Sequence, residues 1–232
     1  MSVPTAESHT RISRYGMVNA FLVEEDDGLT LIDTALKGTG KKILAQASAL
    51  GKPIVRIVLT HAHGDHIGSL DELHRQLPEA EVLISSRDAI LLSGDKTLQE
   101  GETGKLKGSY PGAKTKPTRT IEGGDRIGSL EAIATPGHTP GHLAFLDTRD
   151  RTLYCGDVFS TLFGVYTTAR ANPLFPLPTM ATWNKELELE SAIELRTHEP
   201  SAIAPGHGPV NIDALEQMDD AIAKSAEIAA HS

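Results

Sequence analysis

Three histidines and an aspartate lie within six positions of the sequence, in the run HAHGDH at 61–66. Imidazole nitrogen and carboxylate oxygen are ligands that zinc takes in proteins, and iron or manganese take them with less preference. His61 and His63 alternate, so at the end of a strand their side chains point to the same face. Asp65 and His66 follow at a turn. Four ligands this close together cannot easily all converge on one ion, so the sequence predicts further ligands downstream.

Three downstream residues are candidates for the remaining ligands, and each lies at the end of a predicted strand. They are His138 in TPGH, Asp157 in CGD and His207 in PGH. A glycine precedes each one, and glycine lets the backbone approach closely because it has no Cβ. We therefore expect these loops to complete the site that HAHGDH begins.

Five motifs in a fixed order make the sequence resemble the metallo-beta-lactamase superfamily. They are LIDT at 31–34, HAHGDH at 61–66, PGH at 136–138, GD at 156–157 and GH at 206–207. The resemblance implies a four-layer αββα sandwich and two divalent metal ions, with Zn²⁺ expected and Fe or Mn as alternatives. It assigns the ligands as follows: His61, His63 and His138 to the first ion, Asp65, His66 and His207 to the second, and Asp157 as a bridge.

Two more residues are expected to support the ligands from outside. Asp33, in the LIDT motif, ends a predicted strand and could simply cap a turn, but in the family this position supports the histidine ligands. His142 lies four residues after His138 and is expected to orient a ligand or to serve the structure.

The surrounding pattern predicts the elements that would position these residues. An Asp-Gly turn at 25–28 predicts a hairpin over 17–34. Apolar spacing predicts helices over 41–50, 67–77, 86–92, 181–197 and 212–229, and strands over 54–59, 81–84 and 201–204. Short strands are expected from 119 to 158, and loops over 93–117 and 159–178. This mixture predicts a single α/β (α+β) domain over 1–232.

Composition excludes several classes of partner. A net charge of -9 without a cluster of Lys and Arg argues against nucleic acid, whose phosphates require many local positive charges. No apolar run approaches the roughly 18 residues of a membrane span, and the first residues have no apolar signal region. The single cysteine, Cys155, fits a reducing compartment and is expected to lie buried in a strand. We therefore expect a cytoplasmic enzyme for a small-molecule substrate.

The implied chemistry is hydrolysis of an ester-type carbonyl bond. Two ions about 3.5 to 4 Å apart can share one water molecule and lower its pKa, so that a bridging hydroxide attacks the carbonyl carbon. Asp65 is the candidate to orient this nucleophile and to carry its proton to the leaving group. A lactone or a glutathione thioester is the expected substrate, because an aspartate at 157 resembles the lactonase and glyoxalase II branches more than the β-lactamases.

An oxidoreductase remains the alternative. Persulfide dioxygenases of this superfamily hold one iron through residues equivalent to His61, His138 and Asp157. The presence of His207 argues for two metals and against this alternative.

Two loops are expected to decide the substrate. The 159–178 segment is a candidate pocket wall because it contains Phe159, Leu162, Phe163, Tyr166, Leu174 and Phe175. Phe159, Phe163 and Tyr166 are the candidate substrate contacts, although core packing or a subunit contact would explain the same residues. The segment 93–117 is long enough to cover the metal edge or to reach a second subunit, so a homodimer is compatible with the sequence.

Overall fold

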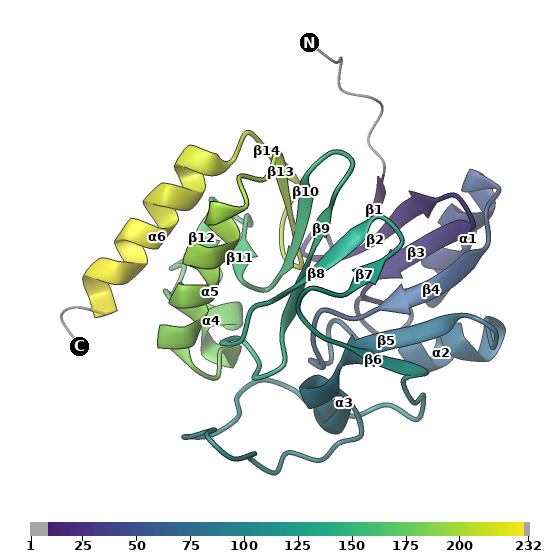
Figure 1. Ribbon diagram of the computed structural model, residues 1–232, viewed down its shortest axis with the longest axis horizontal. Helices are drawn as coiled ribbons and strands as arrows, with labels where there is room; N and C mark the ends of the chain where they lie inside the picture. The colour runs from purple at the N-terminus through teal and green to yellow at the C-terminus, as the bar shows by residue number, and fades with distance from the viewer. Residues whose placement is uncertain (1–8, 230–232) are drawn as a thin grey trace.

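A computed structural model describes residues 9–229, and their main strands form two six-stranded sheets that pack against each other (Figure 1). The first sheet contains, in spatial order, β1 (His9–Arg14), β2 (Val18–Glu25), β3 (Gly28–Ile32), β4 (Ile54–Val58), β5 (Glu81–Ser85) and β6 (Arg119–Ile121). The second contains β14 (Asn211–Ile212), β13 (Ala202–Pro205), β10 (Thr152–Gly156), β9 (Leu143–Asp147), β8 (Leu130–Ala134) and β7 (Arg126–Ile127). A separate pair joins β11 (Phe159–Ser160) to β12 (Tyr166–Thr167).

Helices cover the outer faces of both sheets. The first sheet packs against α1 (Gly40–Leu50), α2 (Leu70–Gln76) and α3 (Ser86–Leu92). The second packs against α5 (Lys185–Thr197) and α6 (Leu215–Ala229), and the short α4 (Leu177–Ala181) precedes α5. Figure 1 shows α5 and α6 on one side of the molecule and α1 and α2 on the other. The expected four-layer αββα sandwich is confirmed.

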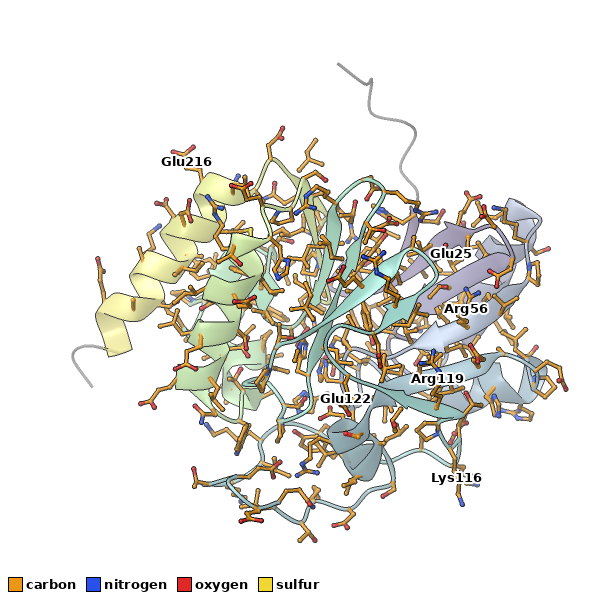
Figure 2. All side chains as sticks on the ribbon, viewed as in Figure 1. Glu25, Arg56, Lys116, Arg119, Glu122 and Glu216 are labelled. Carbon is orange, nitrogen blue, oxygen red and sulfur yellow. The ribbon has the colours of Figure 1, made fainter. Side chains whose placement is uncertain are left out.

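Successive side chains of a strand point to opposite faces of its sheet, and in these sheets both faces are buried. On β2, Ala20 and Leu22 face the helices of the first half, whereas Phe21 and Val23 enter the core between the sheets. Side chains fill the spaces between the layers (Figure 2). A sheet that is buried on both faces needs apolar residues at successive positions, as β2 has them.

The strand directions bring loops from both sheets to one edge. Strands β3 to β6 run parallel, and so do β10 and β13, so the carboxyl ends within each set meet. The two sheets are joined there by backbone hydrogen bonds from Leu143 N–H to Thr60 O and from Asn19 N–H to Gly206 O, each 2.9 Å long. This edge holds the motifs that the sequence singled out.

Several elements differ from the sequence prediction; among them, β14 (Asn211–Ile212) reaches the start of the predicted helix over 212–229, which begins at Leu215 as α6. β1 was not predicted, because its residues HTRISR lack apolar periodicity and it forms by pairing with β2 as an edge strand. The segment 159–178 contains β11 and β12 and is therefore not a plain loop. The predicted helix over 181–197 begins only at Lys185, as α5, because the Asn184 side chain caps it by accepting hydrogen bonds from Glu186 N–H and Leu187 N–H. The short α4 before it was not predicted.

Charged residues are spread over the molecule. Glu216 lies on α6, whereas Arg56 and Arg119 lie on strands of the first sheet at the other side (Figure 2). None of the helices between residues 9 and 229 combines the length and apolar character needed to cross a membrane. The predicted domain of 1–232 includes residues 1–8 and 230–232, which lie outside the described part of the chain.

Candidate metal centre

Seven predicted ligands come together at this edge from four loops. HAHGDH follows β4, His138 lies between β8 and β9, Asp157 follows β10 and His207 follows β13. Their ligand atoms form three overlapping groups, within each of which the atoms lie within 4.8 Å of one another: His61, His63 and His138; His61, His66 and Asp157; Asp65, His66 and His207. The first and last groups have the membership that the resemblance implied for the two ions.

Asp157 lies in the middle of the cluster. Its Oδ2 atom is 3.3 Å from His138 Nε2 and 3.1 Å from His207 Nε2, and its Oδ1 atom is 3.3 Å from His66 Nε2. Asp65 Oδ2 is 3.4 Å from His207 Nε2. The Asp157 carboxylate thus stands between the two groups, where a bridging ligand would have to lie.

The pairing of buried polar atoms fits a bound cation. His61 Nε2, His66 Nε2 and Asp157 Oδ1 are buried and make no hydrogen bond within residues 9–229. Orphaned atoms of this kind are rare unless an ion or water satisfies them. Gly206 adds to the fit, because a Cβ there would lie 2.4 Å from Asp157 Oδ1 and 2.5 Å from His66 Cε1. The donor set and the packing suit a divalent metal ion with nitrogen and oxygen ligands.

Asp33 holds the HAHGDH loop through three contacts. Its carboxylate accepts hydrogen bonds of 2.8 Å from the N–H and hydroxyl of Thr60, and it lies 2.8 Å from His66 Nδ1. The Asp33 backbone has a φ of 57°, a left-handed conformation that is costly for a non-glycine residue. The contact with Nδ1 leaves His66 Nε2 to face the cluster. This is the supporting position predicted for Asp33.

The break between α4 and α5 holds the His138 loop. His138 Nδ1 lies 3.0 Å from Thr182 Oγ1, and Trp183 N–H donates to His138 O over 3.1 Å. Asn184 N–H donates to Gly137 O over 2.9 Å. The contact with Thr182 directs His138 Nε2 toward Asp157. The non-helical residues 182–184 between α4 and α5 therefore serve the site, and the prediction of a helix from residue 181 missed them.

His142 supports the centre without facing it as a ligand. Its Nε2 accepts a 3.1 Å hydrogen bond from Asp157 N–H, and its Nδ1 lies 2.7 Å from Thr135 Oγ1. Burial lowers the pKa of His142 to about 3, so the ring is neutral and can accept at Nε2. Gly156 allows this approach, because a Cβ there would lie 2.4 Å from His142 Nε2.

Asp88 is a site residue that sequence reasoning missed. It is fully buried, and its carboxylate accepts hydrogen bonds from Ala62 N–H at 2.8 Å, Thr139 Oγ1 at 2.9 Å and Gly141 N–H at 2.9 Å. These donors belong to the HAHGDH loop and the His138 loop, so one side chain joins both. Ser85 and Asp88 have the spacing of a helix capping box. This local role explains the aspartate by itself, so the sequence gives no sign of its contacts with the two ligand loops.

Asn19 and Met17 were missed in the same way. Asn19 Nδ2 donates to Pro205 O at 2.8 Å and to Gly208 O at 2.6 Å, on both sides of His207. His207 Nδ1 lies 3.2 Å from Met17 O. The start of β2 therefore positions a ligand loop that is almost 190 residues away in the sequence.

The two groups of ligands differ in their electrostatics. Burial is the main reason that the pKa values of His61, His63 and His138 lie below the ordinary value, and that of His63 falls to about 4. Although burial opposes it, the charges of Asp157 and Asp65 raise the pKa of His207 to about 9. The first group therefore offers neutral imidazoles. In the second group, the carboxylates of Asp65 and Asp157 favour positive charge at His207, and they would favour a metal cation in the same place.

A cavity of about 670 Å³ opens onto the cluster. Its wall contains ligand side chains, including Asp65 and His207, and apolar residues from distant segments. The apolar residues are Met17, Val18, Leu36, Pro111, Phe175, Leu177, Pro178, Met180 and Ala181. Gly108, Ser109 and Pro111 also line it, so the segment 93–117 borders the metal edge.

The predicted substrate contacts lie elsewhere. Phe159 is fully buried in the core between the second sheet and its helices. Tyr166 lines a separate pocket beside α6, and the Phe163 side chain is 61 % exposed. None of the three belongs to the described lining of the cavity at the cluster. Pairing of β11 with β12 turns these residues away. Phe175, from the same predicted segment, does line the cavity, together with residues of α4.

Comparisons with known proteins agree with this geometry. The sequence model described as "Metallo-beta-lactamase superfamily" matches residues 14–207. The uncharacterized protein YobT of Bacillus subtilis (strain 168) is 48% identical over 210 residues, which are 90% of each chain. A hydroxyacylglutathione hydrolase of Rhodospirillum rubrum is 34% identical over 136 residues, or 57% of this chain and 42% of that protein. The crystal structure of TTHA1623 in a di-iron-bound form superposes with a TM-score of 0.65 at 28% identity, covering 90% of this chain and 96% of that one.

Proposed function

This chain belongs to the metallo-beta-lactamase superfamily, and on that premise we propose that it is a hydrolase that opens a lactone, or cleaves a related uncharged ester, with an apolar acyl group. The cavity at the ligand cluster is the observation that supports this choice. Its wall is predominantly apolar, and no Lys or Arg occurs among its described lining residues. An apolar acyl chain would be buried there, whereas a charged one would lose its hydration without gaining an ion pair.

The residues of the cluster would divide the work of hydrolysis. Two divalent ions held by these ligands would supply an activated water molecule and polarise the scissile carbonyl. Asp65 lines the cavity, and His66 and His207 hold the pKa of its carboxyl well below its usual range, although burial opposes them. An ionised Asp65 can accept the proton of the attacking water and pass it to the leaving oxygen as the carbon–oxygen bond breaks. Asp157 lies between the two ligand groups and would hold them at a fixed separation.

A glutathione thioester is the second candidate, and the relative named hydroxyacylglutathione hydrolase favours it. Glutathione carries two carboxylates and an ammonium group at neutral pH. No Lys or Arg among the described lining residues is available to pair with these carboxylates, which is why a neutral substrate is preferred here. The oxidoreductase alternative needs one iron, and His207 within 3.4 Å of Asp65 supports a second metal position instead. Zn²⁺ is the proposed metal for both positions, with iron or manganese as alternatives.

Matched pairs of substrates test this proposal. Lactones with N-acyl chains of increasing length are assayed beside the same lactones whose chains end in a carboxylate, a glutathione thioester and a β-lactam. For the neutral series, each CH₂ that enters the cavity is expected to raise kcat/KM by up to about fourfold, since burying one CH₂ contributes about 0.8 kcal/mol. The carboxylate series should lose this gain.

Metal content of the purified protein, measured by elemental analysis, completes the test. Near two zinc ions per chain with turnover of the neutral lactones would support the proposal. Faster turnover of the glutathione thioester than of the neutral lactones would show that the substrate is a thioester and not a neutral ester. One iron per chain, with oxygen-dependent consumption of a persulfide, would show that the protein is an oxidoreductase and not a hydrolase.

A further inference from the structure

In each candidate ligand histidine, one ring nitrogen faces the cluster and the other contacts a supporting group. The supporting group of His63 comes from a different part of the fold than those of the other histidines. The partners of His61, His66, His138 and His207 belong to the folded sandwich; they are, in that order, Thr60, Asp33, Thr182 and the Met17 carbonyl. The partner of His63 is the carbonyl oxygen of Lys107, which lies 3.0 Å from His63 Nε2. Lys107 belongs to the segment 93–117, and it is exposed. An exposed loop therefore holds a buried ligand.

The contact determines which nitrogen of His63 carries the proton. A carbonyl oxygen can only accept a hydrogen bond, so in a neutral ring Nε2 must be the donor. The lone pair then lies on Nδ1, which is 3.0 Å from His138 Nε2 inside the cluster. The opposite tautomer would direct an N–H group into the cluster and could not ligate a metal there.

We propose that the segment 93–117 helps to form the metal centre. Its Lys107 carbonyl fixes the tautomer of His63, and Gly108 permits this contact. The inference rests on the proposed function for its metal centre and not for its substrate. Lys107 and Gly108 are positioning residues, since they act through His63.

Gly108 has a second reason to be glycine besides its backbone angle. Its φ is +84°, and a Cβ there would lie 2.3 Å from His63 Nε2 and 2.7 Å from Cε1. Gly104 lies in the same segment with a φ of +79°, and a Cβ there would have nothing within 4 Å. Alanine would strain both backbones similarly, but only at position 108 would it displace the loop from His63. The chain thus offers a matched pair of variants.

Other contacts hold the segment in place on both sides of Lys107. Gly64 N–H donates to Ser109 O over 2.9 Å, and the Tyr110 ring centroid is 4.6 Å from that of His63. Trp183 Nε1–H donates to Thr103 O over 2.9 Å. Because binding free energies are reciprocal, a loop that favours the ligating form of His63 must itself be held more firmly once a metal is bound.

The first test compares metal affinity in Gly108→Ala and Gly104→Ala. Zinc and cobalt(II) affinities are measured by competition with a chromophoric chelator, which needs no substrate. One of the two metal sites is expected to bind 10- to 100-fold more weakly in Gly108→Ala, the range seen when an outer partner of a ligand is lost. In Gly104→Ala both sites should stay within about twofold of the original protein. Equal affinities in the two variants would overturn the inference.

Two measurements on the unaltered protein keep the test independent of how the variants fold. Nitrogen NMR of the histidine rings should show the proton of His63 on Nε2, and a proton on Nδ1 would refute the inference. Trypsin should cleave after Lys105 and Lys107 more slowly when zinc is bound, and cleavage that ignores zinc would also refute it. Failure of every substrate assay with these results intact would remove the proposed function and leave this inference standing.

Discussion

At the scale of single residues, the candidate centre consists of the ligand side chains and of the residues that orient them. Asp157 N–H is bound by His142, and His66 is bound by Asp33. Neither supporting residue faces the cluster as a ligand. Substitution of ligands and of supporting residues should therefore have different consequences, which separates their roles.

Replacing Asp65 by alanine tests its proposed double role. Asp65→Ala removes a candidate ligand and the candidate proton carrier together, so kcat should fall by about 10²- to 10⁴-fold. Asp65→Asn keeps the size and one oxygen but cannot take up a proton, so it should lose activity while retaining more metal. Steady-state kinetics and elemental analysis of both variants check this, and an unchanged kcat in either would remove Asp65 from the reaction.

Asp88 should make stability depend on pH. Burial raises the pKa of its carboxyl to about 6, against the opposing hydrogen bonds from Ala62, Thr139 and Gly141. Between its unfolded pKa near 3.9 and about 6, the folded protein holds the proton more tightly than the unfolded chain does. This group therefore adds stability as the pH falls through about 6, and the contribution is lost as the pH rises.

Asp88→Asn removes that titration and one of the oxygens that accept hydrogen bonds. The difference in unfolding free energy between the original protein and the variant should grow as the pH is lowered from 7 to about 5. Urea unfolding in the presence of a chelator measures it without a contribution from metal loss. A difference that stays constant over this range would contradict the raised pKa.

At the scale of elements, the break between α4 and α5 places Thr182 and Trp183 against the His138 loop. Asn184 makes this break by capping α5. A continuous helix through these positions would satisfy the backbone internally and leave Gly137 O and His138 O without these donors. The N-cap thus connects helix formation with the position of a ligand.

Asn184→Ala should lower the unfolding free energy by about 1 kcal/mol, the usual effect of losing an N-cap. Asn184→Ser, which can still cap, should restore most of it. Urea unfolding of the two variants provides the measurement. If serine were no better than alanine, the capping hydrogen bonds to Glu186 and Leu187 would not be the cause.

At the scale of the whole molecule, the cluster joins the two halves of the sandwich at one edge. HAHGDH belongs to the first sheet, and His138, Asp157 and His207 belong to the second. An ion bound between them should therefore hold both sheets together. Its binding free energy adds to the stability of the folded state, because the unfolded chain has no preformed site.

Removal of metal should accordingly lower the melting temperature. At a free zinc concentration 100 times the Kd, binding contributes about 2.7 kcal/mol, and for a chain of this length that corresponds to about 5 to 10 °C. Calorimetry or circular dichroism with chelator, and again after zinc is restored, measures the shift. A melting temperature that responds to neither treatment would contradict a metal centre between the sheets.

The sequence by itself determined the class of fold, most elements and the candidate ligands. Ligand types and their spacing in HAHGDH are local, and helix and strand periods are local too, so they can be read without a structure. The local rules failed where a distant contact overrides them. β1 forms by pairing with β2, and α4 and α5 are separated where residues 182–184 bind the His138 loop.

Only the tertiary structure decided what surrounds the ligands. Asp88 is a helix-capping residue by its spacing, yet it joins two ligand loops because α3 packs beside both. Of the residues in the predicted pocket wall, Phe175 does line the cavity, whereas Phe159 and Tyr166 turn away with β11 and β12. Met17 and Pro111 also line it, and nothing in their local sequence indicated this. Neighbours that are far apart in the chain meet only when the sheets pack, so spacing along the sequence carries no signal of them.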